Sequence, residues 1–96
     1  MLRSSVERRL ARATSRLQAA RAELAVLDEQ VAALAGDADD ARVRALVSDS
    51  PLDGQEHRQA ARAADRMAVS RAALVAELAQ LERTIDDLLD RLAPSR

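Results

Sequence analysis

Residues 47–57 read VSDSPLDGQEH, a polar stretch with one proline and one glycine between two long runs rich in Ala, Leu and Arg. A serine directly before a proline signals a helix start, because the Ser50 hydroxyl can cap free N–H groups and Pro51 has no N–H to satisfy. Asp53, three residues after Ser50, completes a pattern close to a capping box. The stretch therefore predicts a turn at residues 48–50 and a new helix from about residue 51.

The runs on either side of this turn carry apolar residues in a heptad pattern. Before the turn, one row of residues spaced by seven is Leu10, Leu17, Leu24, Val31, Ala38 and Ala45. A second row, offset from the first, is Val6, Ala13, Ala20, Leu27, Leu34 and Ala41. After the turn, the two rows are Leu78, Ile85 and Leu92, and Ala60, Met67, Leu74, Leu81 and Leu88. Such sustained 3-4 spacing is typical of a coiled coil.

The fold class predicted from these features is all-α, a long antiparallel two-helix coiled-coil hairpin. It forms one domain over residues 1–96, with helices over about residues 4–48 and 51–93. Ser4 or Ser5 is expected to cap the first helix, and Pro94 to stop the second. Seam residues should pair with position numbers that sum to about 98, or to about 105 in a register with a longer loop.

Gly36 leaves two alternatives for the first run. A break at the glycine gives three helices, over about residues 4–35, 38–48 and 51–93. A continuous helix tolerates the glycine at a cost of about 1 kcal/mol. Because the heptad frame passes Gly36 without a slip, the sequence favours a continuous helix, with at most a kink there.

Charge is distributed unevenly along the chain. The opening segment carries, against the single acid Glu7, the basic residues Arg3, Arg8, Arg9, Arg12, Arg16 and Arg21. The closing segment carries, against two arginines, the acidic residues Glu77, Glu82, Asp86, Asp87 and Asp90. Antiparallel packing lays the basic end beside the acidic end, whereas a parallel dimer lays like charges together. The asymmetry therefore favours the hairpin.

Composition excludes several classes of protein. The chain contains no aromatic residue and no cysteine, and its formal net charge is −1. Disulfide and thiol chemistry are therefore excluded, and no overall field attracts nucleic acid. No apolar run approaches the roughly 18 residues that a membrane span requires, and the N-terminus lacks an apolar signal region, so a cytoplasmic protein is expected.

A single seam of Leu and Ala buries little apolar surface per ordered residue. We therefore expect two hairpins to associate as a homodimer, or the hairpin to lie against a protein partner. The candidate partner patch near the turn consists of Val43, Leu46, Val47 and Leu52. The alternative for these four residues is a slipped seam that closes the hairpin's own tip.

Few residues have the chemistry that catalysis requires. His57, the single histidine, lies near Ser48, Ser50 and Asp53. A hairpin tip supplies neither the rigid pocket nor the oxyanion hole that a Ser-His-Asp triad needs. Capping and solvation are therefore the preferred roles, and no catalytic or cofactor site is predicted.

Arg71 occupies a seam position of the second helix. We expect its long stem to leave the seam and its charge to meet an acid such as Asp28. A register lock or a partner contact is the alternative. The acidic run Asp37, Asp39 and Asp40 lacks the glycine and the ligand spacing of an EF-hand, so no metal site is predicted.

The candidate basic face of the first helix consists of Arg8, Arg9, Arg12 and Arg16. A helix that tracks phosphates would arrange its arginines in this way. The stretch lacks aromatic residues for base stacking and large apolar anchors for a membrane. Pairing with the acidic closing segment explains these arginines without a ligand, so nucleic-acid binding is the weaker interpretation.

Two resemblances add to this interpretation. The stretch ARVRALVSDSPLDGQEHRQAARAADRM, followed by LAQLERTIDDLLDRL, resembles short uncharacterised coiled-coil proteins of high-GC Gram-positive bacteria, which implies a helical hairpin and no activity. In outline the hairpin is also similar to the Gre and DksA class of factors, which insert such a hairpin into the RNA polymerase secondary channel. That similarity implies a candidate acidic tip of Asp49, Asp53 and Glu56. The chain departs from those factors because it has no tip Asn, no second globular domain and no zinc motif.

The sequence thus favours a non-enzymatic coiled-coil interaction or scaffolding module that binds a protein partner or a second copy. The first alternative is a regulator of the secondary-channel type that uses the acidic tip. The weaker alternative is a nucleic-acid-binding arm that uses the basic face.

Overall fold

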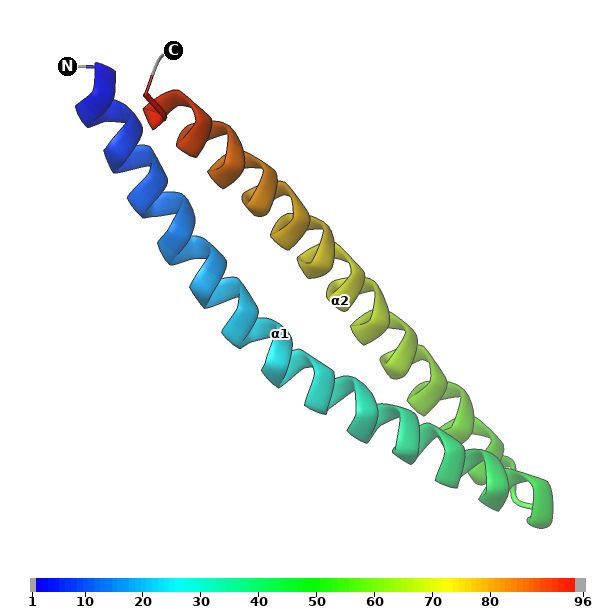
Figure 1. Cartoon of the computed structure of the whole chain (residues 1–96). Coiled ribbons are helices and arrows are strands. Elements are labelled where there is room, and N and C mark those ends of the chain that lie inside the picture. Colours follow the sequence, from blue (N-terminus) through cyan, green and yellow to red (C-terminus); the bar gives the residue numbers. More distant parts are fainter. Residues whose placement is uncertain (1, 95–96) are drawn as a thin grey trace. The chain divides into compact units, whose positions relative to one another are not determined.

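The computed structural model describes residues 2–94 and contains two helices joined by a short turn (Figure 1). Helix α1 spans Leu2–Val47, and helix α2 spans Pro51–Leu92. Residues 48–50 form the turn at the predicted place. The all-α helical hairpin predicted from the sequence is confirmed.

The chain divides into two compact units, each built from one segment of α1 and one segment of α2. The terminal unit comprises Met1–Leu24 and Ala73–Arg96, and the turn unit comprises Ala25–Ala72. Within each unit the two helical segments lie side by side and run in opposite directions (Figure 1). That residues 1–96 form one domain stays a prediction.

The start of α2 follows the predicted chemistry in part. The backbone N–H of Leu52 donates to Ser50 Oγ at 3.3 Å, and Pro51 is the first helical residue, so the N-cap is confirmed. The backbone N–H of Ser50 donates to Ser48 Oγ at 3.0 Å. This bond takes the place of the reciprocal bond that a capping box assigns to Asp53, so the capping-box prediction was wrong.

The other helix ends show one error and one agreement. Helix α1 begins at Leu2, so the prediction that Ser4 or Ser5 caps it was wrong. The residues before these serines include no proline or glycine that would keep the helix from beginning sooner. Ser4 Oγ, rather than capping the helix, accepts a hydrogen bond from Arg8 Nη1 at 2.9 Å. Helix α2 ends at Leu92, just before Pro94, as predicted.

Helix α1 passes through Gly36 without interruption, and this glycine does not adopt a positive φ. The alternative with three helices was therefore wrong. A Cβ placed on Gly36 would meet nothing within 4 Å, so the residue faces open space. A glycine there weakens the helix by about 1 kcal/mol and leaves the seam unaffected.

The predicted heptad rows form the seam between the helices. The residues of both rows, from Val6 to Ala45 in α1 and from Ala60 to Leu92 in α2, are buried or half-buried. The turn has only the residues 48–50, so the alternative register, which needs a longer loop, was wrong. The register with numbers that sum to about 98 is the one observed.

The hydrophobic core of the terminal unit lies toward the end of its seam that contains Leu24 and Leu74. Leu17 and Ala20 of α1 form a buried cluster with Leu78 of α2. The half-buried residues packed against this cluster are Leu24, Leu74, Leu81 and Ile85. Leucines beside the buried Ala20 build this cluster, in the alternation of large and small residues that packs a helix seam.

Candidate functional site

The candidate partner patch is exposed on the turn unit. Val43, Leu46 and Val47 of α1 are 48%, 73% and 82% exposed, and Leu52 of α2 is 59% exposed. A slipped seam would bury these side chains, so that alternative was wrong. The structure therefore brings four large apolar residues to the surface where α1 ends and α2 begins.

The helical repeat explains why the patch faces outwards. The seam of α1 continues through Ala41 and Ala45, of which Ala41 is buried. Residues three and four apart lie on one helix face, so Val43, Leu46 and Val47 share a face that is turned away from these alanines. The inner side of the tip is therefore closed by small residues, and the large ones stay outside.

The candidate acidic tip is only partly exposed. Asp49 in the turn and Glu56 in α2 are exposed, whereas Asp53 is half-buried in the first turn of α2. An acid in a first turn interacts favourably with the helix dipole, which gives Asp53 a structural role. Within residues 2–94, no group of three or more His, Cys, Asp or Glu side chains is placed to hold a metal ion.

The residues considered for a catalytic triad are not joined into one. The hydroxyls of Ser48 and Ser50 accept the backbone hydrogen bonds of the turn, as the capping interpretation expects. His57 Nδ1 is buried and has no hydrogen-bond partner among the described residues. His57 stands seven residues before Ala64 and fourteen before Arg71, so it belongs to the seam row of Leu78. This spacing is the signal that could have placed His57 in the seam.

Beside His57, the turn unit contains an open groove of about 320 Å³ between its segments of α1 and α2. The residues that line it are Ala35, Ala38, Asp39, Arg42, His57, Ala61, Ala64 and Asp65. Alanines at the seam and beside it, on both helices, leave this space unfilled. Sequence reasoning missed the groove, although the coincidence of alanines on the two helices could have indicated it.

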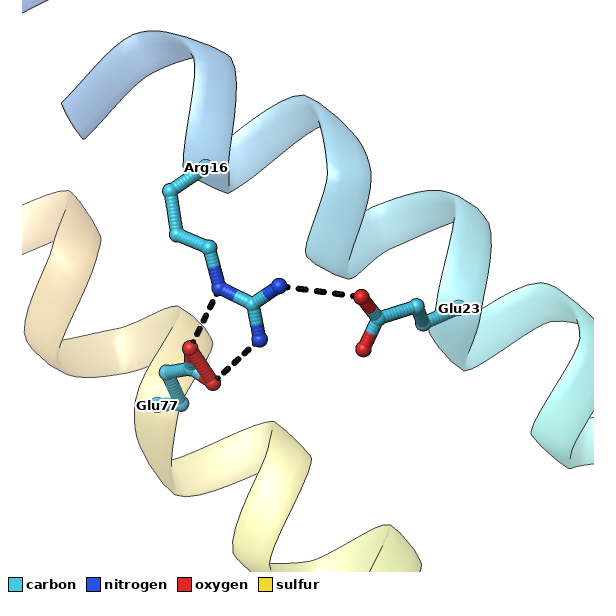
Figure 2. Close-up of polar contacts among 3 residues, drawn as sticks. All are labelled: Arg16, Glu23 and Glu77. Carbon is cyan, nitrogen blue, oxygen red and sulfur yellow. Dashed lines mark hydrogen bonds and ion pairs between the residues drawn. The ribbon is translucent and has the colours of Figure 1, made fainter. Parts of the chain in front are cut away.

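The best-defined polar contact of the terminal unit is made by Arg16, one of the candidate basic-face residues (Figure 2). Arg16 Nε donates to Glu77 Oε1 at 2.6 Å, and Arg16 Nη2 donates to Glu77 Oε2 at 2.8 Å. Arg16 Nη1 also donates to Glu23 Oε1 at 2.9 Å. The guanidinium thus bridges α1 and α2 with a bidentate pair, the geometry that favours Arg over Lys.

These contacts shift the protonation equilibria of both groups. The hydrogen bond from Arg16 holds the pKa of the Glu77 carboxyl below its ordinary value of 4.5, and this effect outweighs desolvation. The hydrogen bond to Glu77, followed by that to Glu23, holds the pKa of Arg16 above its ordinary value. All three groups are partly open to solvent, so the network is electrostatic support rather than a reactive centre.

The rest of the basic face is divided among different contacts. Arg8 donates to Ser4, and within residues 2–94 no ion pair joins Arg9 or Arg12. Outside this face, Arg21 Nη2 lies 3.7 Å from Glu82 Oε1. With Arg16 and Glu77, this pair confirms that the basic opening segment lies beside the acidic closing segment.

Arg71 leaves the seam as predicted. Its Nε donates to the Asp28 carboxylate of α1, within the turn unit. Both side chains keep more than two-fifths of their surface exposed, at 43% and 48%. The pair satisfies a charge at a seam position. A role of Arg71 as a register lock or a partner contact stays a prediction.

Neither helix contains, in the described part of the chain, an apolar run that could cross a bilayer. Comparison of the chain with protein-family models, curated proteins and solved structures finds no match. Function is therefore inferred from the surfaces described above.

Proposed function

We propose that the protein is a non-enzymatic interaction or scaffolding module that binds a protein partner through the patch of Val43, Leu46, Val47 and Leu52. A cytoplasmic location belongs to the same proposal. The observation that carries it is the exposure of these four side chains, from 48% to 82%, at adjacent helix ends. Contiguous exposed apolar side chains mark interaction sites more often than isolated ones do.

The patch has the layout of a helix-docking surface. Val43, Leu46 and Val47 follow the i, i+3, i+4 spacing by which one helix face anchors in a partner's groove. Burying a Val or Leu side chain completely contributes about 1.5–3 kcal/mol. Leu46 and Val47 are the most exposed of the four, so they have the most to gain from a partner.

The terminal unit supports this role by supplying stability elsewhere. Its buried Leu17, Leu78 and Leu88 and its ion pair between Arg16 and Glu77 do not involve the patch. Substitutions in the patch should therefore leave the helices folded, which makes the proposal testable.

The test is affinity capture from the native host with immobilised full-length protein. The wild type should retain a protein that the double variant Leu46→Ser, Val47→Ser loses. The matched control is Val26→Ser, Val69→Ser, because these exposed valines also belong to the turn unit and lie outside the patch. Circular dichroism should show equal helix content in all three. Equal retention by the patch variant and the wild type would contradict the proposal.

The same assay separates the alternatives. Asp53→Ala and Glu56→Ala should leave partner retention unchanged. Loss of an effect on transcription by RNA polymerase in these two variants would instead support the secondary-channel alternative. Salt-dependent retention on DNA that disappears when Arg8, Arg9 and Arg12 become Gln would support the nucleic-acid alternative.

A further inference from the structure

We propose that two copies of this chain pair through their α2 helices, related by a two-fold axis that passes beside Ala61. In this pair, α2 of each copy covers the groove in the turn unit of the other. The inference rests on the proposed interaction role and names a second copy as one partner. It concerns a different surface from the patch, so the two can be tested separately.

The pairing surface is a stripe on α2 beside the seam. Its residues, at alternating spacings of four and three, are Gly54, Arg58, Ala61, Asp65 and Ala68. Ala61 and Asp65 line the groove. Ala61 at the centre and Ala68 at one end are small and allow a second helix to approach at the short end of the usual interaxial range of about 8–10 Å. At the other end, the Arg58 side chain lies beside Gly54 and has to swing toward the second copy.

The order of residues in this stripe is self-complementary. In an antiparallel two-fold arrangement centred on Ala61, a residue before Ala61 in one copy faces the residue at about the same distance after Ala61 in the other. Arg58 then meets Asp65 of the second copy, and Asp65 meets Arg58 in return. Gly54 and Ala68 meet each other, so small residues face small ones. A parallel arrangement would instead place Arg58 against Arg58.

The charges in this stripe are available for such a contact. Arg58 and Asp65 are both exposed, and within residues 2–94 neither takes part in an ion pair. At the rim of the same groove, Arg42 Nη2 lies 3.0 Å from Asp39 Oδ1, so that pair is already neutralised. Arg58 and Asp65 are the charges that a second copy would compensate.

The solvent-exposed surface of the chain is large enough to include an interface with a second copy. A folded monomer of this mass exposes about 5,400 Å² by the usual scaling with mass. This chain exposes 6978 Å². The excess follows from a fold with a single seam, which buries little surface per residue. It leaves room for an interface of the standard size, roughly 800 Å² per partner, without locating it on the chain. The open groove with alanine walls is part of the exposed surface of the turn unit, and the unpaired His57 Nδ1 is buried beside it.

A charge swap tests the inference. Sedimentation equilibrium of the full chain should show a dimer for the wild type. Arg58→Asp and Asp65→Arg each place like charges together twice, so each should raise the dimer dissociation constant at least about tenfold. The double variant Arg58→Asp, Asp65→Arg restores both contacts and should return the dissociation constant close to that of the wild type. The control Arg66→Asp makes the same charge change on an exposed residue of α2 outside the stripe and should have little effect.

Three results would overturn the inference: a wild type that stays monomeric, a dimer that the single variants do not weaken, or single variants that the double variant fails to rescue. Circular dichroism of each variant identifies any loss of helix. The variant Leu46→Ser, Val47→Ser should keep the dimer while it loses partner capture. A monomeric wild type that still captures a partner through the patch would remove this inference alone. A charge-dependent dimer without capture would remove the proposed function of the patch alone.

Discussion

The terminal unit and the turn unit are built on the same heptad frame and differ in what occupies it. Among the described residues, the terminal unit buries Ala13, Leu17, Ala20, Leu78 and Leu88. The turn unit buries Ala41 alone. The frame sets where the helices meet, and the side-chain volumes at the frame positions decide how much of the seam is closed.

The surfaces of the two units differ in the opposite sense. Among residues 3–94, six of the eight exposed large apolar residues belong to the turn unit, and they include the whole partner patch. His57 and Arg71 also occupy seam positions of this unit, and the charged end of Arg71 leaves the seam to reach Asp28. We therefore expect the terminal unit to supply most of the folding stability. The turn unit carries the surface proposed for recognition, since a residue buried in the seam is not available to a partner.

The largest expected effect tests whether the seam of the terminal unit contributes more to stability than the seam of the turn unit. Leu88→Ala removes a side chain that is 2% exposed and should lower the free energy of unfolding by about 2–5 kcal/mol. Met67→Ala, at a half-buried seam position of the turn unit, should cost roughly half as much or less, because less surface is lost from the seam. Urea denaturation followed by circular dichroism measures both. Equal losses would mean that the two units contribute equally.

The next effect concerns the turn itself. Ser50→Ala removes the oxygen that accepts the N–H of Leu52 and should cost about 1 kcal/mol of unfolding free energy. Ser4→Ala is the matched control, because Ser4 lies inside α1 and caps nothing, so its effect should stay within about 0.5 kcal/mol. Thermal denaturation compares the two, and a Ser4 variant that loses as much as the Ser50 variant would contradict this account of the cap.

A substitution in the turn unit that raises stability, rather than lowering it, is the next test. Gly36→Ala should raise the unfolding free energy by up to about 1 kcal/mol, since the residue is helical, has no positive φ and has open space at its Cβ. Gly54→Ala should gain less, because Gly54 lies near the start of α2 and helix ends fray. The new Cβ would be in ordinary van der Waals contact, 3.5 Å from Arg58 Nη1. Amide hydrogen exchange should slow around residue 36 in the first variant. An unchanged or lowered stability there would show that α1 is interrupted at the glycine in solution.

The smallest expected effect belongs to the terminal unit and depends on pH. Arg16 lowers the pKa of Glu77 in the folded state, so this contact stabilises the fold above the ordinary value of 4.5 and is lost as pH falls through the lowered pKa. The melting temperature of the wild type should therefore exceed that of Glu77→Gln at neutral pH, and the difference should vanish in acid. Glu29→Gln, an exposed acid of the turn unit, serves as the control. A difference between wild type and Glu77→Gln that persists unchanged at low pH would show that the contact acts by packing rather than by charge.

Much of the fold could be predicted from short-range signals. Ser50 and Pro51 marked the start of α2, and the unbroken frame across Gly36 marked α1 as continuous. The contact between Arg71 and Asp28 followed from one seam position and the antiparallel register. The errors arose where several local partners compete, as when Ser48 rather than Asp53 took the N–H of Ser50. The Ser48 side chain is short and already held by the turn, so it loses little conformational entropy when it accepts this bond. The longer Asp53 side chain on the helix would lose more.

The candidate site was harder to predict from the sequence than the fold was. The patch around Leu46 could be named from the sequence, but whether it closed the tip or stayed exposed could not be decided. The groove beside His57 and Ala61 was not foreseen, because it depends on which alanines of α1 stand opposite which alanines of α2. Its capacity to receive a second copy stays a prediction.

The sequence by itself determined the number of helices, the position of the turn, the direction of packing and the residues of the seam. These follow from periodicity, from proline and serine chemistry and from the sum of charges along each segment, all of which can be counted in one dimension. Only the tertiary structure decided which seam positions close, where a groove remains and which apolar residues stay in water. Those outcomes depend on the volumes of side chains that face each other across the two helices, and facing pairs exist only once the chain has folded back on itself.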